Sequence, residues 1–234
     1  MKTIRLIEID ALRGLAVASM ILFHALFDAQ LLDLIPDQHL FSGNWLSFAR
    51  LVQFIFLGLV GVSIYLSSRG FEAQLKRGAW IFGAGLLVSF ATWVIFPESF
   101  VKFGILHCIG LSIPLVSLFK RRPEWGLPVA ALVFFLGALF LRQTVESPWL
   151  FWLGLHRADF ASFDYFPILP WLAVPLVGLF VGSRLYAKGQ PTRLVVLAKV
   201  PALSFLGRHA LAVYLLHQPV LYFSLWGLSH WIFT

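Results

Sequence analysis

The sequence is poor in charged residues. Asp, Glu, Lys and Arg make up only 12% of its 234 residues, whereas an average soluble domain has about 25%. Regular alternation of apolar and polar residues, the pattern of a half-buried strand, is also missing. What remains is 59% hydrophobic, with a mean hydropathy of +0.84. These values exclude an ordinary soluble domain and predict an all-α fold, a polytopic integral membrane bundle of about seven transmembrane helices.

Cysteine is nearly absent as well. Cys108 stands alone, which excludes an intramolecular disulfide and says little about the compartment. Low-complexity segments and clear internal repeats are missing, so we expect a single domain over residues 1–234. The first apolar run has no small-residue cleavage site, and we therefore expect a retained helix there and not a cleavable signal peptide.

Seven apolar runs approach the ~20 residues that a helix needs to cross a bilayer. The fourth and fifth are on the short side. The runs cover residues 10–29, 46–66, 78–96, 102–119, 126–142, 165–186 and 207–230. Small residues inside such runs favour close helix packing. We expect this role for Gly58, Gly61, Gly83 and Gly85.

Lys and Arg are distributed unevenly between the two sides of these runs. With the N-terminus in the cytoplasm, fourteen of the 18 basic residues lie on the inner side. They are Lys2, Arg5, Arg13, Arg69, Lys76, Arg77, Lys120, Arg121, Arg122, Arg184, Lys188, Arg193, Lys199 and Arg208. The outer side keeps Arg50, Lys102, Arg142 and Arg157. The net charge of +7 is therefore a topology signal, which predicts a cytoplasmic N-terminus and no nucleic-acid partner.

The first apolar run carries four ionisable residues on one face: Asp10, Arg13, His24 and Asp28. At about 100° per residue, the other three fall within about 60° of Asp10. Ionisable groups at membrane depth are costly and usually face a bundle interior or a water-filled cavity. His24 is about 16 Å further out than Arg13. Asp28 follows one turn later, where we expect it to hydrogen-bond the imidazole.

Further polar residues accompany later spans. The histidines and carboxylates fall in the predicted outer half, and the arginines near the inner end. These residues are His107, Asp164, Trp171, Arg184, Arg208, His217 and Gln218.

This asymmetry predicts a reaction that spans the membrane. Arg13, Arg208 and Arg184 are suited to hold phosphates at the inner mouth. A His–Asp pair at the outer end is suited to activate a hydroxyl or an amine. A long donor such as an acyl-CoA would connect the two sides.

Simpler interpretations remain open at each of these positions. Asp10 and Arg13 would then form only an interfacial salt bridge that fixes the first helix. His24 and Asp28 would form only a structural hydrogen bond. His107 and His217 are packing residues in the same view. A different class of function, a transporter or a flippase of a lipid-linked or small polar substrate, would also use intramembrane His and Asp.

Five sequence blocks occur in an order that resembles a known family. They are IEIDALRGLAV with MILFHALFD at the start, FIFLGLVGVSIYLS at 54–67, FGILHCIGLS at 103–112, DYFPILPWLAVPLVG at 164–178 and LGRHALAVYLLHQPVL at 206–221. Together they resemble the bacterial members of the heparan-α-glucosaminide N-acetyltransferase-like family, within a broader group of transmembrane acyltransferases. The resemblance implies transfer of acetyl from cytoplasmic acetyl-CoA to a sugar across the membrane.

The residues that match the family take distinct roles. Asp10, Arg13 and Arg208 are expected to bind acetyl-CoA, together with Arg184, which is included for its predicted position at the inner mouth. No metal is expected. His107, Asp164, Trp171, His217 and Gln218 are expected to bind the substrate. The catalytic candidates are His24 with Asp28 and, in the following loop, His39, which is the nearest counterpart of the catalytic His of the animal enzymes. The implied partners are the lipid bilayer of a bacterial cytoplasmic (inner) membrane, acetyl-CoA and a carbohydrate or glycan acceptor, and glycine and aromatic faces would permit a homodimer.

Overall fold

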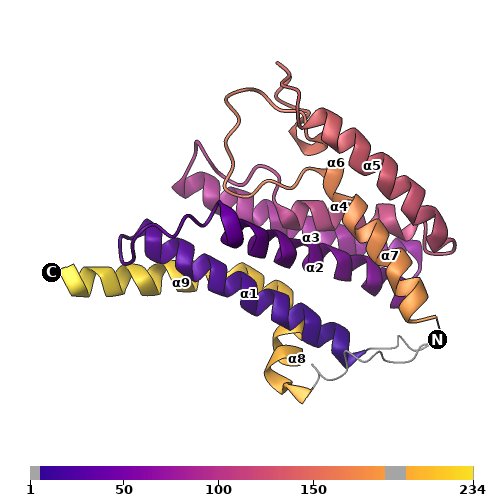
Figure 1. The fold of residues 1–234 in the computed structure, drawn as a ribbon, viewed down its shortest axis with the longest axis horizontal. Helices are drawn as coiled ribbons and strands as arrows, with labels where there is room; N and C mark the ends of the chain where they lie inside the picture. The colour runs from indigo at the N-terminus through magenta and orange to yellow at the C-terminus, as the bar shows by residue number, and fades with distance from the viewer. Residues whose placement is uncertain (1–5, 188–198, 234) are drawn as a thin grey trace. The chain divides into compact units, whose positions relative to one another are not determined.

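The computed structural model describes residues 6–187 and 199–233. Helices dominate this part of the chain (Figure 1). They are α1 (Ile7–Leu31), α2 (Gly43–Leu66), α3 (Phe71–Ile95), α4 (Ile105–Ser117), α5 (Gly126–Phe140), α6 (Ile168–Trp171), α7 (Ala173–Leu185), α8 (Pro201–Arg208) and α9 (Ala210–Phe233). Two 3₁₀ turns, Pro123–Trp125 and Phe151–Leu153, and two isolated bridges complete the regular structure of the described residues. Of the predicted inner basic residues, Lys2, Arg5, Lys188 and Arg193 lie outside them.

Six segments are long and apolar enough to cross a membrane. They are Ile7–Leu31, Gly43–Leu66, Phe71–Ile95, Pro123–Phe140, Ile168–Leu185 and Ala210–Trp231. The predicted all-α membrane architecture is therefore confirmed, and its count of about seven is close. The fourth predicted span, residues 102–119, corresponds to α4, which has only 13 residues and reaches about 20 Å of the ~30 Å hydrocarbon layer.

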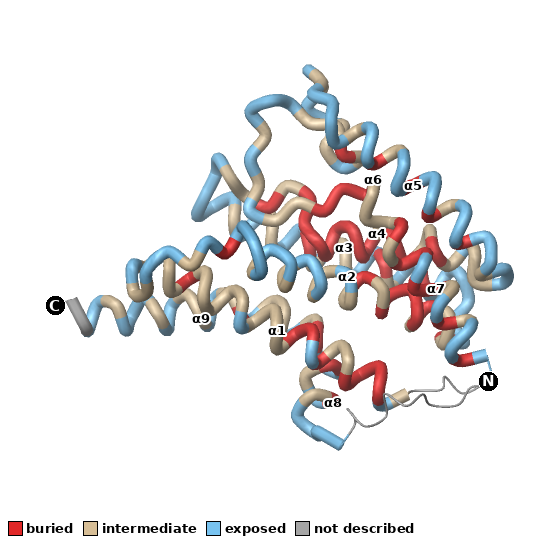
Figure 2. The backbone as a smooth tube through the Cα atoms, in the orientation of Figure 1, coloured by how far each residue is buried: buried red, intermediate tan, exposed pale blue. Residues whose placement is uncertain are grey.

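The short helix α4 is protected by protein. Most of its residues are buried, among them His107, Cys108 and Ser112. Figure 2 shows the same contrast between the buried α4 and the exposed outer side of α5. A helix covered by its neighbours does not need to match the thickness of the bilayer, which explains how a short helix fits among spanning ones.

The chain forms two compact units. One contains residues 57–187, with the second half of α2 and the helices α3 to α7. The other contains residues 6–56 and 199–233, with α1, the start of α2, α8 and α9. We call them the central unit and the terminal unit.

Glycines set the helix contacts of the central unit. A Cβ on Gly61 would lie 1.9 Å from the carbonyl oxygen of Pro175, and one on Gly178 would lie 2.1 Å from that of Gly58. A Cβ on Gly85 would lie 3.0 Å from the ring of His107. The packing role predicted for Gly61 and Gly85 is therefore confirmed. A Cβ on Gly58 itself would meet nothing within 4 Å, although Gly178 packs against the Gly58 carbonyl oxygen. The prediction for Gly83 is wrong, because a Cβ there would meet nothing within 4 Å.

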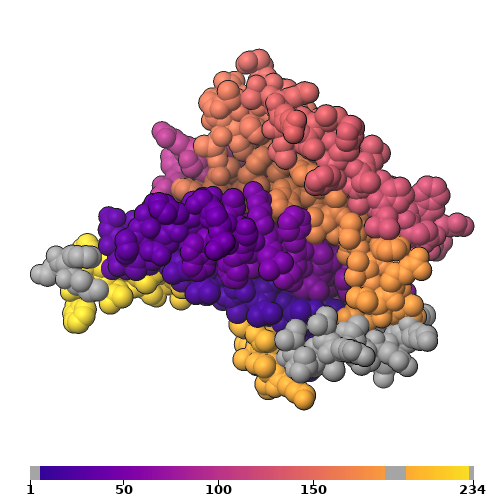
Figure 3. All heavy atoms as spheres, in the orientation of Figure 1, coloured from indigo at the N-terminus to yellow at the C-terminus, as the bar shows by residue number. Residues whose placement is uncertain are grey.

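The outer sides of the long helices are apolar. On α3 the exposed side chains include Trp80, Phe90 and Trp93. On α5 they include Phe134 and Phe135, on the rose-coloured helix of the space-filling view (Figure 3). Such faces would be unfavourable in water and are suited to lipid.

In the terminal unit, α8 crosses α1 at two glycines. A Cβ on Gly14 would lie 1.8 Å from the carbonyl oxygen of Leu203, and one on Gly207 would lie 1.7 Å from that of Asp10. No side chain fits at either position, so the two backbones touch. After this crossing, α9 continues along α1 (Figure 1).

Candidate functional site

The C-terminal part of α1 pairs with α9 through four polar side chains, which we call the α1–α9 quartet: His24, Asp28, His217 and Gln218. Nδ1 of His24 lies 3.1 Å from Nε2 of His217, and the ring centroids are 4.9 Å apart. One turn further along α1, the Nε2 amide of Gln218 donates to Oδ1 of Asp28 at 2.8 Å. Asp28 and His217 are buried. The quartet therefore joins two membrane-spanning helices by side-chain hydrogen bonds.

Two oxygens of the quartet have no hydrogen-bond partner among the described residues. They are Oδ2 of Asp28 and Oε1 of Gln218, and both atoms are buried. A buried acceptor without a donor costs about 1–3 kcal/mol, so such atoms are uncommon unless a ligand or water supplies the donor. The quartet thus offers two hydrogen-bond acceptors to a ligand that carries O–H or N–H groups.

The predicted hydrogen bond between His24 and Asp28 is not the one that forms. His24 pairs with His217, and Asp28 pairs with Gln218. The prediction used only the spacing along one helix, where residues four apart are neighbours. The facing helix α9 supplies partners that sequence spacing cannot reveal.

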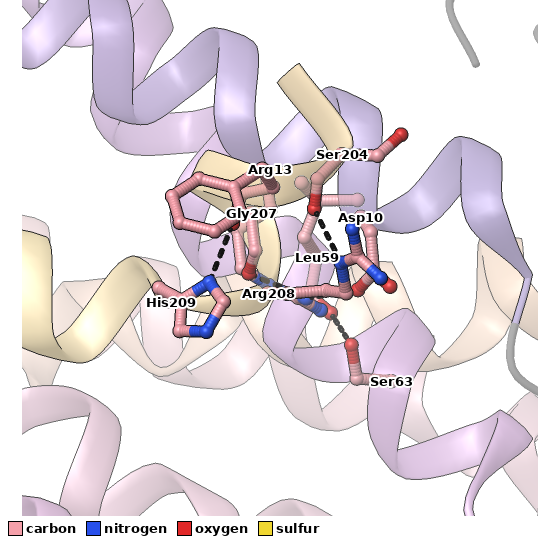
Figure 4. A network of polar contacts seen from close by, with 9 residues as sticks. Asp10, Arg13, Leu59, Ser63, Ser204, Gly207, Arg208 and His209 are labelled. Carbon is pink, nitrogen blue, oxygen red and sulfur yellow. Dashed lines mark hydrogen bonds and ion pairs between the residues drawn. The ribbon is translucent and has the colours of Figure 1, made fainter. Parts of the chain in front are cut away.

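Polar contacts also connect the N-terminal part of α1 to α8, as drawn in Figure 4. The Nη1 group of Arg13 donates to Oδ1 of Asp10 at 2.9 Å and approaches the carbonyl of Gly207 at 3.4 Å. The ion pair that the sequence suggested is therefore present. Arg208, which is exposed, donates from Nε to the carbonyl of Ser204 at 3.3 Å. Its charge is consequently more accessible than that of Arg13 to an anionic ligand.

His39 lies in the loop between α1 and α2, on the surface. Its side chain is 79% exposed, and its Nδ1 is 3.1 Å from Oδ2 of Asp37. The backbone of Asp37 and His39 forms a local turn in which the His39 N–H donates to Oδ1 of the aspartate at 2.8 Å. His39 thus also belongs to a His–carboxylate pair, but this pair is surrounded by solvent.

His107 of the central unit is fully engaged by its neighbours. Its Nδ1 accepts the N–H of Gly104 at 3.1 Å, and its Nε2 lies 3.4 Å from the hydroxyl of Ser89. The rings of Phe82 and Phe103 pack against it at 5.0 and 5.4 Å. An acceptor at Nδ1 places the single proton of the neutral ring on Nε2. Both nitrogens are therefore used to fix the start of α4.

Asp164 acts at the same helix end. Its Oδ2 accepts the N–H of Ile105 at 2.9 Å, which satisfies a free amide of the first turn of α4. Desolvation raises the pKa of this carboxyl to about 6, although the hydrogen bond from Ile105 opposes the rise. Trp171 lies on α6 and packs on Phe166, with 4.6 Å between the ring centroids. His107 and Asp164 are thus brought together, as parts of one helix start.

Arg184 borders a cavity of about 340 Å³ in the central unit. The lining residues are Tyr65, Lys120, Arg121, Pro123, Glu124, Phe180, Ser183 and Arg184. The guanidinium of Arg184 lies 5.0 Å from the ring centroid of Phe180. Lys120 donates to the carbonyls of Ser67 and Arg69, and burial lowers its pKa. Sequence reasoning took Lys120 and Arg121 only as topology signals, although their KRR run marked this concentration of positive charge.

Two of the sites described above contain arginines: the cavity, with Arg121 and Arg184, and the N-terminal end of α1, with Arg13 and, on α8, Arg208. Both are chemically suited to phosphate groups, because guanidinium groups bind phosphate oxygens by charge-assisted hydrogen bonds. No cluster of three or more His, Cys, Asp or Glu side chains in the described ranges has the arrangement of a metal site.

Comparison with protein families gives one match that spans nearly the whole chain. The family model for the catalytic region of heparan-alpha-glucosaminide N-acetyltransferase matches residues 5–219. The comparisons with curated proteins and with solved structures give no match. The matched residues include α1 and the first ten residues of α9, and therefore every residue of the quartet. Together with six membrane-length helices, this match shows that the chain is an integral membrane protein that belongs to the heparan-α-glucosaminide N-acetyltransferase catalytic family, a family of acetyltransferases.

Proposed function

We propose that this protein transfers an acetyl group from cytoplasmic acetyl-CoA to a hydroxyl or amine of an extracytoplasmic sugar or glycan, in the cytoplasmic membrane of a bacterium. The observation that carries the proposal is the α1–α9 quartet. It combines histidines with unsatisfied buried acceptors inside two apolar helices. Polar groups in such a setting are costly and usually serve transport or chemistry.

The quartet supplies both requirements of acyl transfer to a hydroxyl or amine. Oδ2 of Asp28 and Oε1 of Gln218 accept hydrogen bonds from the acceptor sugar. His24 takes the proton of the attacking group while its oxygen or nitrogen bonds to the acetyl carbon. The bond from that carbon to sulfur breaks, and His24 returns the proton to the leaving thiolate. Acceptor and donor react directly in this sequence, without an acetyl-histidine intermediate.

The donor requires positive charge at the inner end. Arg208 is exposed beside the Asp10–Arg13 pair, and we assign it the main contact with the phosphates of CoA in the terminal unit. Arg13 holds its orientation through Asp10 and Gly207. Arg184, with Lys120 and Arg121, is the corresponding anion site of the central unit.

The test is transfer and binding by the purified protein in lipid nanodiscs. With [¹⁴C]acetyl-CoA and a panel of amino sugars and glycan fragments, label should appear in at least one acceptor. A ligand at 100 times its Kd stabilises a protein by about 2.7 kcal/mol, so acetyl-CoA should raise the Tm clearly. The Arg208→Ala variant should lose most of this rise, whereas Arg50→Ala serves as a matched surface control.

A transporter of lipid-linked sugars would give the opposite pattern. It would show neither stabilisation by acetyl-CoA nor labelled product, and this result would contradict the proposal. An acetylated form of the protein, trapped in a single turnover without acceptor, would contradict direct transfer and favour a covalent histidine intermediate.

A further inference from the structure

The two histidines of the quartet differ in what their ring nitrogens contact. Nδ1 of His217 lies 2.6 Å from the backbone carbonyl of Tyr214 on the same helix. Nε2 of His217 lies 3.1 Å from Nδ1 of His24. A carbonyl oxygen can only accept a hydrogen bond, so the Nδ1 of His217 must carry a proton. This single contact determines the protonation pattern of the whole pair.

In a neutral imidazole only one nitrogen carries a proton. With its proton on Nδ1, the His217 ring presents a lone pair at Nε2, and the facing Nδ1 of His24 must be the donor. The lone pair of His24 is therefore at Nε2.

We infer that His217 is a positioning residue that fixes His24 in the tautomer with an unprotonated Nε2, the atom that takes the proton from the acceptor. The inference rests on the proposed acetyl transfer. It replaces two expectations drawn from the sequence, that Asp28 orients His24 and that His217 contacts the substrate. The order of donation runs from His24 to His217 and from His217 to the carbonyl of Tyr214.

The arrangement also supports His24 after it has accepted the proton. The resulting imidazolium keeps its Nδ1–H on the lone pair of His217, so the new charge has a hydrogen-bond acceptor at once. The carbonyl of Tyr214 holds the His217 ring in place through its contact with Nδ1. The His217 ring is also buried, and its centroid lies 5.6 Å from that of the Tyr214 ring. Asp28 is left to bind Gln218 and the acceptor.

Two substitutions of His217 separate tautomer control from packing. Gln can accept from His24 through Oε1 and donate to Tyr214 through Nε2, whereas Leu fills similar space and does neither. His217→Leu should lower kcat by about 100-fold, within the range that a general base contributes, with KM changed less than about twofold. His217→Gln should recover kcat to within about fivefold of the unsubstituted protein. His230→Gln, at the exposed end of α9, is the matched control and should leave kcat unchanged.

The tautomer itself can be read without catalysis. In protein labelled with [¹⁵N]histidine in nanodiscs, His24 should show a protonated Nδ1 and an unprotonated Nε2, with its signals assigned from the His24→Gln variant. His217→Leu should move the proton to Nε2, and His217→Gln should retain it on Nδ1.

The outcomes distinguish the inference from the proposed function. An unchanged His24 tautomer in folded His217→Leu protein overturns the positioning role, and so does an unchanged kcat. Absence of acetyl transfer by the unsubstituted protein overturns the proposed function. In that case the nitrogen spectra still decide whether His217 sets the tautomer of His24.

Discussion

His107 in the central unit and His24 in the terminal unit are both histidines of apolar helices, but their surroundings differ. His107 is buried, and its two nitrogens contact Gly104 and Ser89. His24 is only partly buried, and its partner His217 engages one nitrogen. An imidazole with both nitrogens occupied holds its neighbours in place. An imidazole with one lone pair to spare can exchange a proton with a ligand, so the first pattern indicates structure and the second indicates chemistry.

The carboxylates near these histidines repeat the contrast. Asp164 accepts the amide of Ile105 and fixes the beginning of α4. One oxygen of Asp28 accepts a hydrogen bond from Gln218, and its other oxygen has no donor in the part of the chain that the structure describes. The same residue types thus complete a scaffold in one unit and leave hydrogen-bonding capacity in the other.

The largest expected effect is on catalysis, from replacing His24. Because His24→Ala removes the proposed base, kcat should fall by at least about 1,000-fold, while the Tm and the binding of acetyl-CoA change little. The transfer assay and a thermal shift measure these quantities. His39→Ala is the companion variant and should change kcat less than about twofold. Transfer at the normal rate by His24→Ala, with loss in His39→Ala, would make the loop histidine the base.

Replacing His107 should affect stability instead. His107→Ala leaves the Gly104 N–H without its acceptor and opens a cavity between Phe82 and Phe103, at a cost of about 2–4 kcal/mol. The Tm in detergent should fall accordingly, whereas kcat per folded molecule should stay close to normal. A stable variant that has lost transfer would show that His107 contacts the substrate and would remove the contrast with His24.

Asp164 should make the stability of the central unit depend on pH. Desolvation raises its folded pKa from 3.8 to about 6, so the folded state holds the proton more tightly than the unfolded chain. Its contribution to stability is therefore highest below pH 4 and falls as the pH rises to about 6. Asp164→Asn keeps an acceptor for Ile105 and should be more stable by about 1–2 kcal/mol above pH 6. Melting curves of both proteins between pH 4 and 8 measure this difference, and parallel curves would contradict it.

The smallest expected effect concerns two glycines of α3, of which only Gly85 lies against His107. A Cβ at Gly85 would lie 3.0 Å from the His107 ring, whereas one at Gly83 has nothing within 4 Å. Gly83→Ala should raise stability by about 0.5–1 kcal/mol, the usual gain in a helix. Gly85→Ala should lose that gain and about 1 kcal/mol more, because the ring is held by two hydrogen bonds. Equal Tm values for the two variants would show that the His107 ring moves easily.

The sequence was informative where the physics is local. Hydropathy located the spanning helices, and a spacing of three residues correctly paired Asp10 with Arg13. It failed where a partner comes from another helix: His24 and Asp28 are neighbours on α1 but bind His217 and Gln218 of α9. The sequence predicted a short fourth span at residues 102–119, but α4 is shorter still, with 13 residues, because burial by neighbouring helices replaces the contact with lipid that hydropathy measures.

The glycine crossing of α1 and α8 fixes the register in which the quartet residues of α1 and α9 meet. Gly14 precedes His24 by ten residues, and Gly207 precedes His217 by ten residues. The crossing precedes the histidine pair along both segments, so α9 runs in the same direction as α1 beyond Gly14 and Gly207. One residue inserted between Gly207 and His217 would turn the second ring by about 100° away from the first, while the crossing itself stayed intact. The contact between the two histidines therefore depends on the number of residues that separate each of them from the glycine crossing. The crossing lies about 15 Å away along the helix, where neither imidazole makes any contact.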